Sequence, residues 1–243
     1  MRKILKRLAW LNKARNIRKY LYSAGDMNPI ERDFRGSIIL APHPDDETIG
    51  CGGLIAKFFA TVDVVFLTRG ESGIPDLGKE ETSSIRLSEL TSVMEYFGVN
   101  HSTMLEYPDG RLRETKGLLT GLDLNSFENI LIPSIFEHHP DHQAVAWEVL
   151  ELFRTKELDK SKLIYMYEVW TPLPLFNCYV NIGDVALKKE IALSKYKSQI
   201  KNVPYLKKTI ALNEFRGLQC GCDHAEVFLG VSYNDLEALL NGK

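Results

Sequence analysis

Two short polar loops, each directly after an apolar run, most constrain how this chain can fold. The first, Ala41-Pro-His-Pro-Asp-Asp-Glu47, follows Ser37–Leu40 and precedes the Gly-rich, then apolar segment Thr48–Phe59. The second, Glu137-His-His-Pro-Asp-His142, follows Ile130–Pro133. This order predicts strand, loop and helix, and ligands bind at the carboxyl ends of strands in parallel α/β sheets. We therefore expect the two loops to meet over one sheet edge.

From Ser37 onward, strand-like and helix-like runs alternate. Alternation with crossovers of this length predicts an α/β fold with a Rossmann-like, doubly wound, mostly parallel sheet and helices on both faces. The predicted strands are Ser37–Ala41, Val62–Thr68, Ser102–Tyr107, Asn129–Pro133, Leu163–Trp170, Cys178–Ile182 (as an edge strand) and Glu226–Ser232. The predicted helices are Glu47–Ala60, Glu80–Phe97, Leu118–Phe127, His142–Phe153, Asp184–Gln199, Leu206–Leu218 and Asn234–Leu240.

The length of the chain, 243 residues, suits one α/β domain, and a hydrophobic fraction of 44% is enough for its core. We predict a single domain over residues 37–243. Residues 1–36 are predicted to be a basic arm followed by a polar linker, Gly25–Gly36. The arm, residues 1–22, holds eight Lys or Arg and no acid, and its apolar residues recur at helical spacing.

The charges restrict the partners. Outside the arm the chain carries 22 basic and 32 acidic side chains, which gives no support for nucleic-acid binding. Two interpretations of the arm stay open: it lies on an anionic membrane surface, or it packs on its own domain or on a partner subunit. Four scattered cysteines do not make a disulfide scaffold, so we expect a cytoplasmic protein. If the arm lies on a membrane, we expect it to contact the inner membrane surface peripherally. The oligomeric state is left open.

The first loop has the composition of a metal site. Its three acids repel one another unless a cation or a proton separates them. His43 and Asp46 are three residues apart around a turn, and His142 in the second loop could supply a third ligand. Catalytic zinc takes three protein ligands and keeps one position for water, so we predict one Zn²⁺ per chain, although Fe²⁺ or Co²⁺ would also suit these donors. The alternative is that Asp45 and Asp46 merely cap the next helix.

The remaining polar residues of the loops fit amide hydrolysis. A bound divalent cation lowers the pKa of water from about 15.7 toward 7. Asp45, beside the ligands, could take the proton as the general base. His139 could stabilise the oxyanion or protonate the leaving amine, and Asp141 would orient and charge His139.

The paired motifs His43-Pro-Asp-Asp-Glu47 and His139-Pro-Asp-His142 resemble those of the LmbE-like, or PIG-L, zinc deacetylases. These enzymes remove N-acetyl groups from N-acetylglucosamine units of sugar conjugates. Further segments that look like family features are Thr68-Arg-Gly-Glu71, Arg86-x-x-Glu89-Leu90, Tyr107-Pro-Asp-Gly110, Tyr196-x-Ser-Gln199 and Ala225-Glu-Val-Phe228. The resemblance covers about residues 37–232.

The resemblance implies a deacetylase acting on an amino-sugar conjugate, which could be lipid-linked or a polysaccharide precursor. It implies zinc at His43, Asp46 and His142, Asp45 as the base, and His139 steadied by Asp141. Arg69 would contact a polar or anionic part of the substrate, unless it simply pairs with Glu71. Asp109 would accept hydrogen bonds from sugar hydroxyls, unless it is only a turn former.

Two other functions compete with this hypothesis. A metal-dependent phosphoesterase usually needs two metal ions, and the convincing ligands suffice for one. A non-catalytic sugar- or nucleotide-binding module would draw on Gly50-Cys-Gly-Gly53. That segment lacks the G-x-G-x-x-G pattern and follows an acidic loop, so we expect its glycines to allow close packing of a helix on a strand.

Overall fold

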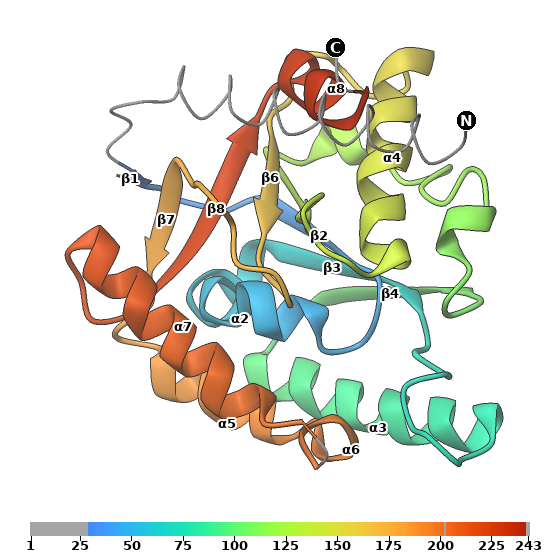
Figure 1. Ribbon diagram of the computed structural model, residues 1–243, viewed down its shortest axis with the longest axis vertical. Helices are drawn as coiled ribbons and strands as arrows, with labels where there is room; N and C mark the ends of the chain where they lie inside the picture. Colours follow the sequence, from blue (N-terminus) through green and yellow to red (C-terminus); the bar gives the residue numbers. More distant parts are fainter. Residues whose placement is uncertain (1–28, 202, 242–243) are drawn as a thin grey trace, which may run out of the picture.

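The computed structural model describes residues 29–201 and 203–241, and within them the strands form one eight-stranded sheet in the order β1-β7-β8-β6-β5-β2-β3-β4 (Figure 1). The strands are β1 Ile30–Glu31, β2 Ser37–Ala41, β3 Val62–Thr68, β4 His101–Tyr107, β5 Asn129–Pro133, β6 Ile164–Tyr167, β7 Cys178–Asn181 and β8 Ala225–Val231. The helices are α2 Asp46–Phe58, α3 Lys79–Phe97, α4 Pro140–Thr155, α5 Ala186–Ser194, α6 Lys197–Ile200, α7 Tyr205–Cys220 and α8 Tyr233–Asn241, with 3₁₀ turns η1 Phe59–Thr61, η2 Leu112–Glu114 and η3 Leu124–Ser126.

The fold belongs to the predicted α/β class. Strands β6, β5, β2, β3 and β4 are parallel neighbours, and β1 is parallel to β7. Strand β8 pairs antiparallel with both β6 and β7. The predicted edge position of Cys178–Ile182 is wrong, because β1 covers the outer side of β7.

Helices cover both faces of the sheet. Because neighbouring strand residues point to opposite faces, Ile38 and Leu40 of β2 enter one core while Ile39 and Ala41 enter the other. The first core is completed by α4 and α8, and the second by α2, α3 and α5 (Figure 1). Strand β2, buried along its whole length, therefore lies at the centre of the molecule, and the loop that follows it is held from both sides.

The structure corrects the predicted linker, of which it describes residues 29–36. Ile30–Glu31 is the strand β1, which pairs with Cys178 and Tyr179. Phe34 is fully buried, with its ring 5.0 Å from that of Tyr165 and 4.8 Å from that of Phe228. The segment from Ile30 onward is thus part of the packed sheet. The predicted arm helix, residues 1–22, lies outside the described residues.

Two predicted helices differ from the observed structure. Residues 118–127 form turns and the 3₁₀ turn η3, because Gly117 and Gly121 adopt φ angles of 69° and 90° that end a right-handed helix. The predicted helix over residues 184–199 is divided into α5 and α6, and Tyr196 between them is buried. Among the described residues, no helix is both long and apolar enough to cross a bilayer.

Candidate metal centre

The loops after β2 and β5 meet, as expected, because these two strands are parallel neighbours. The first loop carries His43, and the second carries His139 and starts α4 with His142 in its first turn. The imidazole centroid of His43 is 4.9 Å from that of His139 and 5.5 Å from that of His142. Segments about 90 residues apart therefore share one polar centre.

One carboxylate oxygen of Asp46 lies close to both of the predicted histidine ligands, His43 and His142. Asp46 Oδ2 lies 3.2 Å from His43 Nδ1 and 3.3 Å from His142 Nε2. Bonds of about 2.0–2.1 Å around a tetrahedral zinc ion place neighbouring donors roughly 3.3 Å apart, so each of these two distances fits a shared ion. Among the described residues, however, His43, Asp46 and His142 are not one of the sets of three whose donor atoms all lie within 4.8 Å of one another. All three residues are buried, and the two imidazoles hold the pKa of Asp46 far below its usual range even though burial alone would raise it.

Other donors surround the same histidine. The sets whose donor atoms all lie within 4.8 Å of one another combine His43 with His139 and His142, and His43 with Asp109 and Asp141. His43 Nε2 lies 3.1 Å from Asp109 Oδ1 and 3.3 Å from Asp141 Oδ2. The centre thus offers more donors than one ion needs, and it brings together every predicted ligand and every predicted catalytic residue of the two loops.

Glu137 supports His142 from behind and was given no role in the sequence analysis. Its Oε2 lies 3.9 Å from His142 Nδ1, and neither atom has a hydrogen-bond partner among the described residues. A histidine that binds metal through Nε2 keeps a proton on Nδ1, and a carboxylate commonly receives it. The other oxygen of Glu137 accepts hydrogen bonds from the N–H groups of Val169, Trp170 and Thr171 at 3.0–3.1 Å. Because these N–H groups bond to Glu137, β6 ends at Tyr167 and not at Trp170, the predicted end of the strand. This buried, unpaired histidine nitrogen fits a metal on the opposite side of the ring.

Asp45 has a strained backbone and a buried side chain. Its φ angle of 128° is outside the usual range for a residue with a side chain, and the side chain makes no capping hydrogen bond to α2, contrary to the capping alternative. Burial raises the pKa of Asp45 to about 7, although the Arg86 guanidinium, 3.2 Å from Asp45 Oδ1, acts to lower it. A cation bound next to it would lower that pKa again. Asp45 is therefore a buried acid that pairs with Arg86 and is adjacent in sequence to the predicted ligand Asp46.

Glu47 and Arg86 hold the loop that carries Asp45. Glu47 Oε2 accepts the Asp45 N–H at 3.0 Å, and its Oε1 accepts the Tyr196 hydroxyl at 2.6 Å. Arg86 donates to the carbonyl oxygens of Pro44 and of Gly70, at 3.3 Å for the latter. Of these residues, Arg86 and Tyr196 entered the sequence analysis only within family-like motifs, because nothing local to them points to the loop.

The structure changes the predicted partner of Asp141. Its carboxylate accepts N–H groups of Gly110 and Leu112 at 2.8 and 3.0 Å and faces His43, not the side chain of His139. His139 Nδ1 instead accepts the backbone N–H of Asp141 at 3.3 Å, which caps α4. Burial and the neighbouring imidazoles lower the pKa of His139.

The two predicted substrate contacts differ in position. Asp109 faces the centre: burial would raise its pKa, but the His43 imidazole outweighs this and lowers the pKa to about 2. Arg69 pairs with Glu106 and not with Glu71, and it lines a neighbouring hollow. The predicted alternative partner of Arg69, Glu71, accepts the N–H of Asp109 at 2.8 Å.

A cavity of about 310 Å³ opens over the centre. Besides the predicted residues, it is lined by Arg86 and by Trp170, Gln199 and Tyr205, which come from the loop after β6, from α6 and from the start of α7. These side chains reach the site through folding of the second half of the chain. The sequence pattern offers no local signal for Trp170 or Tyr205.

The sequence and the fold are similar to those of known proteins. A family profile described as PIG-L, GlcNAc-PI de-N-acetylase, matches residues 38–153. The chain is 30% identical over 224 residues to a diacetylchitobiose deacetylase of Thermococcus kodakarensis, covering 80% of this chain and 82% of that protein. It is 31% identical to a 1D-myo-inositol 2-acetamido-2-deoxy-alpha-D-glucopyranoside deacetylase of Mycobacteroides abscessus, over 47% of this chain and 48% of that one. The structure superposes on N,N'-diacetylchitobiose deacetylase from Pyrococcus horikoshii with a TM-score of 0.71 at 24% identity, covering 86% and 88% of the two chains.

Proposed function

Because the chain belongs to the PIG-L, or LmbE-like, family of de-N-acetylases, we propose that it is a metal-dependent hydrolase that removes the N-acetyl group from an amino-sugar conjugate. One observation carries this proposal: an oxygen of Asp46 lies between His43 and His142, beside the buried and unliganded Asp45. In the proposed reaction this second acid, which Arg86 holds in place, takes the proton of the attacking water.

The fold supports the same location for the site. We interpret the sheet as a Rossmann-like, doubly wound arrangement. In the sheet, β3 and then β4 follow on one side of β2, and β5 and then β6 follow on its other side. In such sheets, ligands bind outside the carboxyl ends of the strands where the strand order reverses. The two polar loops follow β2 and β5, the strands that flank this point.

In the proposed mechanism His43, Asp46 and His142 would hold a divalent ion, which when bound polarises the amide oxygen and lowers the pKa of water. Asp45 accepts a proton as the water oxygen bonds to the amide carbon. His139 stabilises the negative charge that develops on the amide oxygen. The C–N bond then breaks, the amine leaves with the proton, and acetate is released.

Zinc is the proposed ion. Two imidazoles and one carboxylate are a common set for catalytic zinc, and the distance from Asp46 Oδ2 to each imidazole fits its bond lengths. Fe²⁺ and Co²⁺ accept the same donors, so the identity of the ion is tested by metal analysis of protein purified without added metal.

The amino sugar is the best supported part of the substrate. The relatives named above act on diacetylchitobiose and on a glucosaminyl inositol, so their names share the N-acetylated sugar and differ in the attached group. A lipid-linked sugar and a polysaccharide precursor both remain proposals for this chain, as does a cytoplasmic location with the basic arm on the membrane. Asp109 and Gln199 line the cavity where sugar hydroxyls would lie.

The test is a panel of N-acetylated sugar conjugates, each incubated with the full chain and assayed for released amine. We expect turnover of at least one conjugate, loss of turnover after chelation of the metal, and recovery on adding zinc. Cleavage of a generic phosphodiester without release of any amine would replace the proposal with the phosphoesterase alternative.

A further inference from the structure

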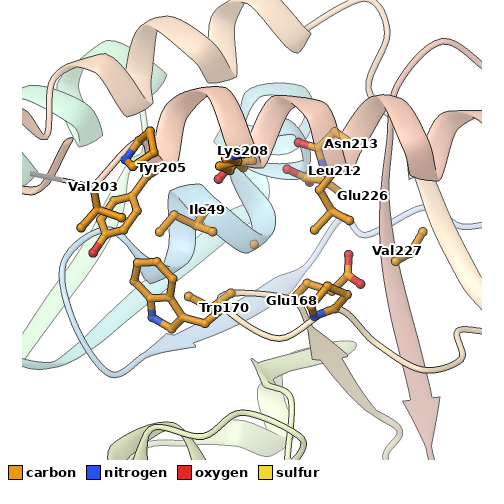
Figure 2. A pocket seen from close by; sticks show the side chains of 15 residues that line it. Ile49, Glu168, Trp170, Val203, Tyr205, Lys208, Leu212, Asn213, Glu226 and Val227 are labelled. Atoms are coloured by element: carbon orange, nitrogen blue, oxygen red, sulfur yellow. The ribbon is translucent and has the colours of Figure 1, made fainter.

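A second cavity, of about 410 Å³, adjoins the one over the metal centre. Trp170 and Tyr205 line both cavities, and their ring centroids are 4.4 Å apart at an interplanar angle of 62°. Figure 2 shows these two rings at one end of the second cavity, Ile49 in its middle, and Glu168 and Glu226 toward the other end. The aromatic pair therefore lies between the centre and a larger space behind it.

The second cavity is suited to an apolar group. Ile49, Val169 and Leu212 are among its aliphatic lining residues. Its two buried carboxylates are engaged by cations of their own: Glu168 pairs with Arg216, and Glu226 accepts a hydrogen bond from Lys189 Nζ at 2.7 Å. These two carboxylates leave no net charge of their own, and the remaining charged lining residue, Lys208, is exposed to solvent.

The polar and the apolar parts of the combined space are separated. Asp109, Ser72 and Gln199 line the cavity over the centre, where an amino sugar would need hydrogen-bond partners. The aliphatic residues lie beyond Trp170, whose side chain is 45% exposed and therefore accessible to a ligand. A ligand that filled both cavities would combine a sugar with an apolar chain.

We infer that the second cavity binds an aliphatic chain belonging to the group attached to the amino sugar. This rests on the proposed function, in which the acyl group removed is acetyl, so a chain long enough to pass the aromatic pair has to come from the attached group. A cavity of this size is typical of small-molecule sites. Burying each methylene should strengthen binding about fourfold.

The experiment has a binding arm and a turnover arm, both with the full chain. Calorimetry measures the affinity for methyl, butyl, hexyl and octyl β-D-glucopyranosides, which lack the amide and do not depend on catalysis. Turnover is measured with N-acetyl-β-D-glucosaminides carrying the same alkyl groups. We expect affinity and kcat/KM to rise about fourfold per methylene until the cavity is filled.

Two matched variants locate the effect. Leu212→Trp places a large side chain in the cavity. We expect the octyl and methyl compounds then to differ by no more than about twofold in affinity and in kcat/KM. Leu218→Trp makes the same change on the same helix at a position that is 78% exposed, and it should keep the wild-type ratio. A circular-dichroism melt of both variants shows that they are folded.

The outcomes separate the inference from the proposed function. Affinity that does not change with chain length, with acetyl release intact, overturns the cavity assignment alone. Chain-dependent binding without any acetyl release supports the cavity and overturns the deacetylase proposal. A third series, methyl glucosaminides with N-butyryl and N-hexanoyl groups, tests the other source: if only these show a chain dependence that Leu212→Trp removes, the cavity binds the acyl group and the assignment to the attached group is wrong.

Discussion

Arg86 Nη2 lies 3.2 Å from Asp45 Oδ1 in a pair whose side chains are both at least nine-tenths buried. The same guanidinium donates to the carbonyl oxygens of Pro44 and Gly70, so it joins the loop after β2 to the loop after β3. Residues far apart in the sequence thus fix the proposed base. The predictions below test that base, the metal ligands and the packing that supports them.

Asp45→Asn removes the proposed base with little change in size. We expect kcat to fall at least about 100-fold, the low end for loss of a general base, while metal content stays unchanged because Asp45 is not among the proposed ligands. The control is Asp184→Asn, which changes an exposed carboxylate that pairs with Lys57 at the surface. Full activity in Asp45→Asn would remove this residue from the mechanism.

His142→Ala deletes a proposed ligand, and His138→Ala deletes its exposed neighbour in the same loop. We expect only the first to lose both metal and activity, because His142 faces Asp46 while His138 does not line the cavity. Metal analysis by mass spectrometry, before and after dialysis against a chelator, measures the difference. Equal metal content in the two variants contradicts the proposed ligand set.

Glu137→Gln tests the support behind His142. The glutamine oxygen can still accept the three backbone N–H groups, but its NH₂ group would face a histidine nitrogen that also carries hydrogen. Metal affinity should fall about 10–100-fold with little change in melting temperature. Competition with a chromogenic chelator measures the affinity, and Glu151→Gln on the exposed side of α4 is the control.

Gly53→Ala tests the close packing of α2 on the strand layer. A Cβ at this position would lie 2.4 Å from Ile182, so the variant should lose about 1–3 kcal/mol of folding free energy. Gly78→Ala, where a Cβ would meet nothing within 4 Å, should leave stability nearly unchanged. Urea denaturation of both variants makes the comparison, and similar midpoints would contradict the packing interpretation.

Lys189→Ala tests a buried ion pair. Lys189 Nζ donates to Glu226 and to the carbonyl of Ile49, while Glu226 accepts the N–H groups of Gly53 and Leu54, so the pair completes the hydrogen bonding of α2. Removing the cation leaves a buried carboxylate unpaired, which costs about 3–5 kcal/mol. The expected fall in melting temperature is roughly 10 °C for a chain of this length.

An apolar replacement of the whole pair, Lys189→Met with Glu226→Leu, should restore only part of this loss. The backbone groups of α2 would still lack their partners, and each buried orphan costs about 1–3 kcal/mol. Full recovery of the melting temperature would show that the pair does not support α2. Lys201→Ala, at an exposed position, controls for the loss of a positive charge.

The sequence was sufficient for features that are local to a strand and the loop after it. Strands β2, β3 and β5 have the predicted bounds because each is a short apolar run that ends at a polar loop. The proximity of His43, Asp46 and His142 could be predicted because their loops follow neighbouring strands. The predicted close packing of the α2 glycines on a strand holds for Gly50, which meets Tyr167 of β6, whereas Gly53 meets Ile182, just after β7, and Gly52 meets Lys189 of α5.

The parts that could not be predicted depend on contacts between distant segments. Tyr196 interrupts a helical run because its hydroxyl bonds to Glu47, 149 residues earlier. Asp141 faces His43 instead of His139 because a turn after β4 presents two N–H groups to its carboxylate. The antiparallel strand β8 enters the sheet from the far end of the chain, and periodicity carries no information on pairing partners.

The φ angle of 128° at Asp45 has a consequence for protein engineering. Glycine would relax this backbone by about 1–3 kcal/mol, but Asp45→Gly would also leave the buried Arg86 guanidinium without its carboxylate, which costs about 3–5 kcal/mol. A screen that selects variants by heat resistance alone would therefore retain Asp45 for its ion pair, whatever its part in the reaction. Thermostabilisation of the chain should keep residue 45 fixed and seek its gains in the outer helices.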